Sequence, residues 1–226
     1  MSSVIIRIFF GPVAPVRAII DTREAVEVDR GTHYAGHPAV HCFINGGRWG
    51  AIFKALANCG KHSVILSIDS TSIKAHRSAA AEKGEHEQAI GRSRGGRTTK
   101  IHALSDPDCR PCAFHLTPGQ DADIGAASAL LALAPPMSWL IADKGYDGDD
   151  FRADIVDRGA KPVIPNKSNR IALHPFNKRA YKGRNVIERC FCRLKDFRRI
   201  ATRYDKLARN FLSAVQLAAI VAYWIN

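Results

Sequence analysis

Cysteine is scarce and irregularly spaced in this sequence. Six cysteines are spread over 226 residues, and no signal peptide with a small-residue cleavage site precedes them. Reduced thiols are therefore favoured over the disulfide framework of a small secreted domain. Cys109, Cys112, Cys190 and Cys192 would bind zinc only if all four converged. The last two point about 200° apart on a helix, so packing cysteines are favoured.

An uninterrupted apolar run of membrane-spanning length is also missing. The longest apolar segment, residues 211–225, contains Ser213 and Gln216 and falls short of the roughly 20 residues that a span needs. It predicts a buried C-terminal helix rather than a membrane anchor. Because the hydrophobic fraction is 46% and the charged fraction 24%, wholesale disorder is excluded as well.

Acidic residues are rare in one part of the chain. Residues 161–210 contain fifteen Lys and Arg but only Glu188, Asp196 and Asp205 as acids, and this difference equals the net charge of +12 for the whole sequence. A strongly basic segment predicts a polyanionic partner, either nucleic acid or an anionic membrane surface.

The hydrophobic pattern predicts an α/β sheet with helices on its faces. Two segments, 64–69 and 139–143, have the pattern of a buried strand that ends on an aspartate, and 98–104 with 112–116 has that of a hairpin. The predicted helices span residues 122–133, 149–158, 181–199 and 207–225. Residues 77–97 are polar and glycine-rich, which predicts a mobile loop that carries Arg92, Arg94 and Arg97.

Three acids are candidates for one site. Asp69 and Asp143 follow two predicted strands, and ligands of open α/β sheets gather at the carboxyl ends of strands. On a continuous helix from residue 181, Glu188 shares an arc of roughly 60° with Tyr181, Arg184 and Lys195. A turn or capping role is the alternative for each aspartate, and a solvated ion pair is the alternative for Glu188.

Three converging carboxylates beside a basic surface would suit a hard divalent cation. Mg²⁺ prefers oxygen ligands and is typically held by a few carboxylates together with substrate phosphate. Two such ions could activate a water or a 3′-hydroxyl and stabilise the leaving oxygen of a displacement at phosphorus. Mn²⁺ would substitute for Mg²⁺ in this chemistry.

The sequence resembles the DDE-type insertion-sequence transposases, in the branch with a Tyr-(2)-Arg-(3)-Glu-(6)-Lys signature. This signature is met at every spacing by Tyr181, Arg184, Glu188 and Lys195. Residues 68–77 (IDSTSIKAHR) and 141–147 (IADKGYD) resemble the first and second aspartate motifs of the family. Residues 91–104 and 201–211 also resemble members of this branch. The resemblance covers roughly residues 48–226.

The resemblance implies an RNase H-like catalytic domain that cleaves element ends and transfers the strands into target DNA. It implies that Asp69, Asp143 and Glu188 bind the metal, with two Mg²⁺ ions expected, and that Tyr181, Arg184 and Lys195 contact DNA or shape the site. The expected partner is double-stranded DNA, both at the element ends and at the target. The chain is expected to act as a homo-oligomer in the cytoplasm, associated with the nucleoid, and no membrane partner is expected. A nuclease-like enzyme and a catalytically inactive DNA-binding protein remain alternatives.

Secondary candidates lie outside this signature. Arg92, Arg94 and Arg97 would grip phosphates without sequence preference if they contact DNA. His76 is the histidine nearest to Asp69 in sequence, and Asp147 is a spare carboxylate close to Asp143. For His76 a hydrogen-bonded structural role is the default, and the position at the end of the predicted strand favours Asp143 over Asp147 as the metal ligand.

Residues 1–47 do not match the rest of the pattern. They lack sustained periodicity and do not resemble the helical end-recognition region of full-length relatives. We therefore expect two domains of unequal character: a poorly patterned arm over 1–47 and a catalytic domain over 48–226. Enzymes of this branch are sometimes split over two reading frames. One interpretation is that the arm is an extension read out of phase, or is disordered, and that the chain works together with an upstream-frame product. The alternative is that the arm is a divergent domain.

Overall fold

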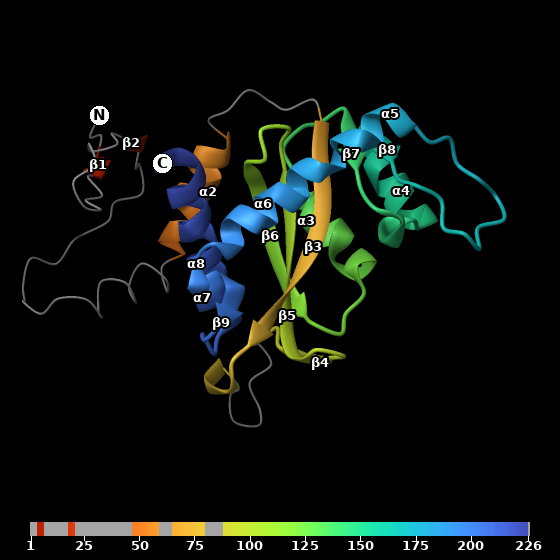
Figure 1. Ribbon diagram of the computed structural model, residues 1–226. Helices are drawn as coiled ribbons and strands as arrows, with labels where there is room; N and C mark the ends of the chain where they lie inside the picture. The colour runs from red at the N-terminus through yellow and green to blue at the C-terminus, as the bar shows by residue number, and fades with distance from the viewer. Residues whose placement is uncertain (1–3, 7–17, 21–46, 59–64, 80–87, 226) are drawn as a thin grey trace, which may run out of the picture.

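A seven-stranded mixed β-sheet forms the centre of the computed structural model (Figure 1). The structure describes residues 4–6, 18–20, 47–58, 65–79 and 88–225. The strands of the sheet are β3 (Ile65–Ala75), β4 (Gly91–Ser93), β5 (Gly96–Ser105), β6 (Pro111–Pro118), β7 (Trp139–Ile141), β8 (Lys161–Val163) and β9 (Thr202–Arg203).

The strand order combines antiparallel and parallel pairs. β5 lies between β3 and β6 and runs antiparallel to both. On the other side of β3, β7 pairs parallel to β3 and β8 pairs parallel to β7. The short strands β4 and β9 pair with β5 and β3. The predicted α/β fold, a mixed sheet with flanking helices, is confirmed, as is the predicted hairpin.

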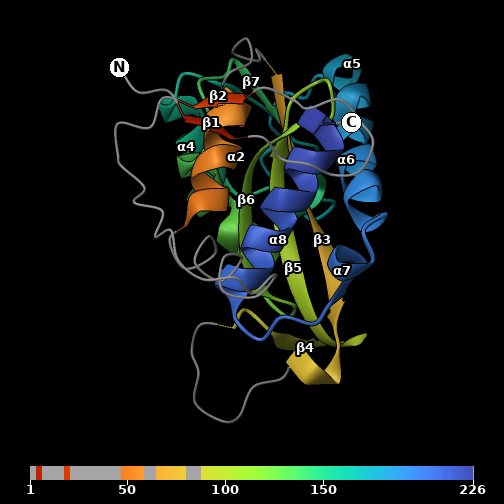
Figure 2. The same cartoon turned by 90° about the vertical axis from the view of Figure 1, so that its left-hand side faces the viewer.

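Helices cover both faces of this sheet. Ala103 and Phe114 pack with one set of helices, whereas their chain neighbours Leu104 and Ala113 pack with another set. Because adjacent strand residues point to opposite faces, the two hydrophobic clusters lie on opposite sides of the sheet. Figure 2 looks onto the first set. It comprises α2 (Arg48–Asn58), α6 (Asn185–Lys195), α7 (Arg198–Ala201) and α8 (Ala208–Ile220), and the second set comprises α3 (Ala127–Ala132) and α4 (Asp149–Asp157).

Short helical turns connect these elements. The 3₁₀ turns are η1 (Arg77–Ala79), η2 (Asp123–Ala126), η3 (Lys144–Tyr146) and η4 (Lys182–Arg184); α5 spans Lys178–Tyr181, and a π-helical turn, η5, spans Val221–Ile225. The prediction of one continuous helix over residues 181–199 is wrong, because α5, η4, α6 and α7 replace it. Gly183, a poor helix former, lies in the first interruption, and Phe197 takes an extended backbone (ψ 111°) in the second.

The C-terminal segment is part of the core. Residues Ala208–Ile225 form the one helical stretch among the described residues that is long and apolar enough to cross a membrane by length and composition. Phe211, Val215 and Ala219 of α8 are nevertheless fully buried against α2, α6 and the sheet. The prediction of a buried C-terminal helix is confirmed.

The N-terminal arm is described only at two short strands. β1 (Val4–Ile6) and β2 (Ala18–Ile20) form an antiparallel pair. The rest of residues 1–46 lies outside the described residues, so the prediction of an out-of-phase, disordered or divergent arm stays a prediction. Helix α2 begins at Arg48, where the sequence pattern changes, and it lies beside α8 (Figures 1 and 2). Trp49, Ile52 and Leu56 pack against the same core.

A fully buried arginine ties the C-terminal region to the sheet. Arg203 of β9 donates hydrogen bonds to the carbonyl oxygens of Asp205 and Lys206, both at 2.9 Å, and to Thr99 Oγ1 at 2.6 Å. Its guanidinium also stacks on the ring of Phe211, 5.1 Å from the centroid. Burial lowers the pKa of Arg203 to about 10, which leaves the side chain charged at neutral pH.

Arg203→Met is expected to lower the free energy of unfolding by about 3 kcal/mol, because several buried acceptors lose their donor at once. Urea denaturation followed by circular dichroism measures this loss. The matched control is Arg209→Met, at an exposed position of α8, which should stay within about 0.5 kcal/mol of the parent. Equal stabilities of the two variants would contradict a structural role for Arg203.

Candidate active site

Asp69 lies in the middle of β3, not at the end of a strand as the sequence predicted. β5 pairs with β3 as far as Lys74 and so extends the strand through the polar residues that follow Asp69. The Asp69 side chain is 13% exposed and accepts a hydrogen bond from the Ser70 amide at 2.8 Å. Burial is the largest influence on the pKa of Asp69 and raises it, against the lowering effects of the Ser70 amide and Arg184.

Asp143 lies beside Asp69 because of the parallel register between β3 and β7. Ser67 of β3 pairs with Ile141 of β7. Asp69 and Asp143 each follow two residues later in the same direction. Consistent with this proximity, the charge of Asp143 contributes to the raised pKa of Asp69. Asp143 also caps η3, where its Oδ1 accepts a hydrogen bond from the Gly145 amide at 2.7 Å.

Arg184 connects Asp69 to Glu188. Its Nη2 lies 2.8 Å from Asp69 Oδ2, and its Nη1 lies 2.9 Å from Glu188 Oε1. Burial tends to lower the pKa of Arg184, but the charges of Asp69, Tyr181, Glu188 and Asp143 outweigh it and raise the pKa. Asp69 and Glu188 therefore contact one guanidinium, and the charge of Asp143 acts on the same guanidinium without a direct contact to it.

The other signature residues lie at increasing distances from this cluster. Tyr181 ends α5, where its ring packs edge-on against Phe176 with centroids 5.2 Å apart, and it still affects the pKa of Arg184. Lys195 is exposed at the end of α6, seven residues and so roughly 10 Å along the helix axis from Glu188.

The arginine cluster is not part of this site. Arg92 and Arg97 face each other across the β4–β5 hairpin and Arg94 lies in its turn, so the prediction of a mobile loop is wrong for these three residues. The alternation of short strand and turn was hidden by the glycines between them. The hairpin and α5 lie at opposite ends of the molecule (Figures 1 and 2). His76 also lies beyond the far end of β3, where its ring stacks on Tyr204 at 4.8 Å.

Asp147 is a buried structural centre. Its two carboxylate oxygens lie 2.8 Å from Arg152 Nη2 and 2.9 Å from Arg170 Nε, and the Lys167 amide donates to it at 2.7 Å. Burial alone would raise the pKa of Asp147, but these three partners outweigh it and lower the pKa to about 2. The sequence offered no spacing signal for this network, since Arg170 is 23 residues away.

A second polar network lies behind Asp69, on the other face of the sheet. Ser70 Oγ donates to Asp123 Oδ1 at 2.7 Å, and Lys100 Nζ lies 2.8 Å from the same oxygen. His102 pairs across from Ser70 in the β3–β5 register, and burial lowers its pKa to about 4, so it is neutral at pH 7. The sequence gives no signal for Asp123, which begins η2 and lies outside the signature motifs.

The donor set fits a hard divalent cation in its chemistry, because it consists of carboxylate oxygens. Within the part of the chain that the structure describes, no three His, Cys, Asp or Glu side chains are arranged closely enough to hold a metal ion. Arg184 supplies the balancing positive charge between Asp69 and Glu188 in this conformation. Both carboxylates are therefore already paired with a cationic side chain in this structure.

Comparison with known proteins identifies the family. The profile described as "Transposase DDE domain" matches residues 60–224. The chain is 36% identical over 127 residues to a protein named as a transposase for insertion sequence element IS6501 of Brucella ovis, an alignment that covers 56% of this chain and 98% of the relative. It is 28% identical over 137 residues to a protein named as a transposase for IS402 of Burkholderia cepacia, covering 56% of this chain and 63% of that relative.

Solved structures show a more distant likeness. A piggyBac transposase synaptic complex with hairpin DNA is 12% identical at a TM-score of 0.34, over 50% of this chain and 25% of that chain. The Mos1 strand transfer complex is 13% identical at a TM-score of 0.30, over 62% and 47% of the two chains. The chain thus spans less than two thirds of the Burkholderia relative and less than half of these two solved chains. The family profile, which covers most of this sequence, carries the assignment: the chain belongs to the transposase DDE domain family, a family of metal-dependent enzymes that act on DNA.

Proposed function

We propose that this chain cleaves DNA at the ends of an insertion sequence and joins the freed 3′ ends to target DNA. In this proposal Asp69, Asp143 and Glu188 hold the catalytic cations. The observation that supports it most directly is the pairing of Asp69 and Glu188 with Arg184, with the charge of Asp143 acting on both Asp69 and Arg184, although the three acids come from separate parts of the sequence.

The metal would be Mg²⁺, with Mn²⁺ as a substitute. Bound to these carboxylates, two ions would activate the attacking water or 3′-hydroxyl and stabilise the leaving oxygen. The protein groups prepare the site: the Ser70 amide orients Asp69, and the Gly145 amide orients Asp143. Arg184 gives up its two carboxylates and its guanidinium then becomes available to a DNA phosphate.

Double-stranded DNA is the proposed partner, at element ends and at the target. The net charge of +12 and the concentration of basic residues in the signature segment support phosphate contacts. We assign such contacts to Tyr181, Arg184 and Lys195 near the carboxylates and to the hairpin residues Arg92, Arg94 and Arg97. The proposal includes a homo-oligomer on DNA at the nucleoid, and an upstream-frame product where the gene is split.

The direct test is incubation of the purified chain with Mn²⁺ and a labelled duplex that carries the inverted repeats flanking its gene. Nicking at the repeat ends followed by products joined to a second duplex supports the transposase. Nicking without joining favours the nuclease-like alternative. DNA binding without metal-dependent nicking favours an inactive DNA-binding protein.

Arg184 and Lys195 should differ in their effect on the salt dependence of DNA binding. Lys195→Ala is expected to reduce the slope of log K against log salt by about one unit, as loss of one phosphate contact does. Arg184→Ala should reduce it by less in metal-free protein, since Asp69 and Glu188 already neutralise that guanidinium. Fluorescence anisotropy with an unrelated duplex between about 50 and 200 mM salt measures both slopes. Equal reductions would show that Arg184 leaves its carboxylates whenever DNA binds.

A further inference from the structure

Asp69 lies at a point where β3 has a strand partner on one side only. The parallel pairing with β7 ends at Ser67, and the pairing with β9 begins at Lys74. Between these points β5 is the one strand, among the described elements, that pairs with β3. The Asp69 carboxylate accepts a hydrogen bond from the Ser70 amide at 2.8 Å, and the direction of that amide depends on the backbone of Ser70. Whatever fixes Ser70 therefore also orients Asp69.

The side chain of Ser70 is held from the other face of the sheet. Its Oγ donates a hydrogen bond to Asp123 Oδ1 at 2.7 Å, although Asp123 is 53 residues away in the sequence. Burial tends to raise the pKa of Asp123, but the hydrogen bonds from Lys100 and Ser70 outweigh it and lower the pKa. Asp123 is thus a carboxylate at neutral pH and can only accept, which fixes the Ser70 hydroxyl as the donor.

Lys100 in turn fixes Asp123. Its Nζ lies 2.8 Å from Asp123 Oδ1 and donates to the carbonyl oxygen of Asp121 at 2.7 Å, and its side chain is only 16% exposed. Because this ion pair is partly shielded from solvent, it keeps one geometry better than a surface pair does. Lys100 belongs to β5, the strand that pairs with β3. We call Lys100, Asp123 and Ser70 the Ser70 network.

The turn that carries Asp123 also supports the segment that carries Asp143. Asp123 begins η2, and η2 packs against η3, which Asp143 caps. The contact is close: a Cβ atom at Gly148, two residues beyond η3, would lie 2.5 Å from Ile124 Cδ1. The Ser70 network is therefore anchored in the packed turns beneath both aspartates.

We propose that the Ser70 network positions Asp69, holding its carboxylate in the orientation that binds a divalent cation. The network acts through the Ser70 amide and does not itself bind the cation. Groups that orient a metal ligand typically contribute about 10- to 100-fold in metal affinity or activity. The proposal rests on the proposed function, because it takes Asp69 as a metal ligand.

The first test follows the Ser70 amide in metal-free protein. Asp123→Ala leaves residue 70 unchanged but removes the acceptor of its hydroxyl, so the hydrogen bond from the Ser70 amide to Asp69 should open more often. Hydrogen exchange of this amide, measured by NMR, should become about tenfold faster than in the parent.

The second test measures Mn²⁺ affinity without DNA, from the electron paramagnetic resonance signal of free Mn²⁺. Ser70→Val and Asp123→Ala should each raise the Mn²⁺ dissociation constant about tenfold. Ser70→Thr matches the valine variant in shape but keeps the hydroxyl, so it should bind Mn²⁺ like the parent. A network that only stabilises the fold would lower the melting temperature of these variants and leave the Mn²⁺ affinity of the folded protein unchanged.

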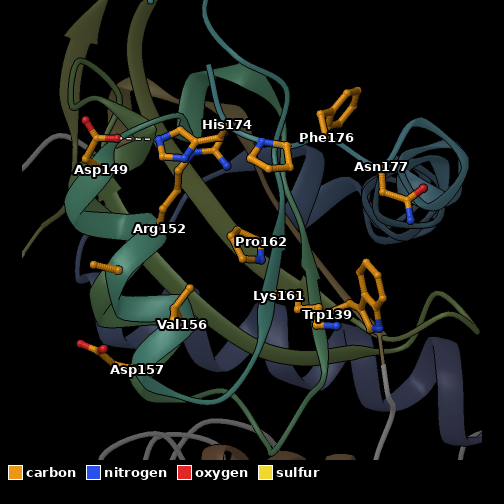
Figure 3. Close-up of a pocket in the computed structure, with 12 residues that line it drawn as sticks. Trp139, Asp149, Arg152, Val156, Asp157, Lys161, Pro162, His174, Phe176 and Asn177 are labelled. Carbon is orange, nitrogen blue, oxygen red and sulfur yellow. Dashed lines mark hydrogen bonds and ion pairs between the residues drawn. The ribbon is translucent and has the colours of Figure 1, made fainter. Parts of the chain in front are cut away.

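Asp149→Ala is the matched control for Asp123→Ala, since Asp149 is also an acid with two side-chain partners. It lies 2.7 Å from Arg170 and 2.9 Å from His174. Figure 3 shows it beside a pocket of about 870 Å³ whose described lining residues do not include the Ser70 network. Its removal should change neither the exchange of the Ser70 amide nor the Mn²⁺ affinity.

Unchanged exchange of the Ser70 amide in Asp123→Ala would overturn the proposal, and so would parental Mn²⁺ affinity in Ser70→Val. Equal losses in Ser70→Val and Ser70→Thr would overturn it as well, because the hydroxyl would then not matter. Failure of the proposed function alone is seen as a parent that binds Mn²⁺ but does not nick DNA. A parent that binds no Mn²⁺ overturns both.

Discussion

Glu188→Gln is expected to abolish metal-dependent DNA cleavage while DNA binding persists. A metal ion supplies several kcal/mol of transition-state stabilisation, so loss of a ligand should slow cleavage by at least about 10²- to 10³-fold. Affinity for duplex DNA should stay equal or increase, because a negative charge near the phosphates disappears. Single-turnover nicking of labelled duplex in Mn²⁺ and anisotropy without metal measure the two effects.

Asp69→Asn and Asp143→Asn should give the same pattern, since the three carboxylates act as one cation site in the proposed function. The matched control is Asp196→Asn, which removes an exposed acid just after α6 and should cleave at the parental rate. If Glu188→Gln retained parental nicking, the third carboxylate would have to be assigned elsewhere. Asp123, on the opposite sheet face, would be the next residue to test.

The sequence predicted the sheet well because its strands are specified locally. Alternation in residues 98–104 and 112–116 gave the β5–β6 hairpin, and the apolar run before Asp143 gave β7. The end of β3 could not be predicted in the same way. Ser70, Thr71 and Ser72 break the apolar run, but pairing with β5 keeps them in the strand, and this pairing is a tertiary effect.

The acids of the site could be predicted from the sequence, but the contact that joins Asp69 to Arg184 could not. The signature spacing identified Arg184 and Glu188, and their i to i+4 separation gives an ion pair even though the predicted long helix is broken before α6. The contact from Arg184 to Asp69 joins residues 115 positions apart. No periodicity within one segment encodes such a contact, because it depends on how α6 packs across the sheet.

The same limit explains why Asp147 was expected to be a spare carboxylate near the site. Its neighbours in sequence, Tyr146 and Gly148, say nothing about Arg170, which comes from beyond β8. Nor does the sequence show that Arg152, one turn into α4, points inward and is itself buried. A charge placed in the interior with two guanidinium partners supports the fold rather than the chemistry.

Asp147→Ala should therefore destabilise the protein strongly rather than mildly. It leaves the buried guanidinium of Arg152 without its carboxylate, and breaking a buried ion pair in this way costs about 3–5 kcal/mol. For a domain of this size the melting temperature should fall by roughly 10 °C. Calorimetry measures the shift. Asp157→Ala, an exposed acid at the end of the same helix, is the control, expected within about 0.5 kcal/mol of the parent.

The pH dependence of stability gives a second signature of Asp147. Its pKa is lowered from the ordinary value of 3.8 to about 2 in the folded protein, so the unfolded chain binds the proton more tightly. The stabilisation from Asp147 is present in full above about pH 4 and is lost as the pH falls toward 2. The parent should lose melting temperature more steeply across this window than Asp147→Ala does. Parallel dependences of melting temperature on pH for the two proteins between pH 4 and 2 would show that Asp147 does not support the fold. An alanine variant that melts within about 2 °C of the parent at pH 7 would show the same, and Asp147 would then become a candidate for the second metal ligand in place of Asp143.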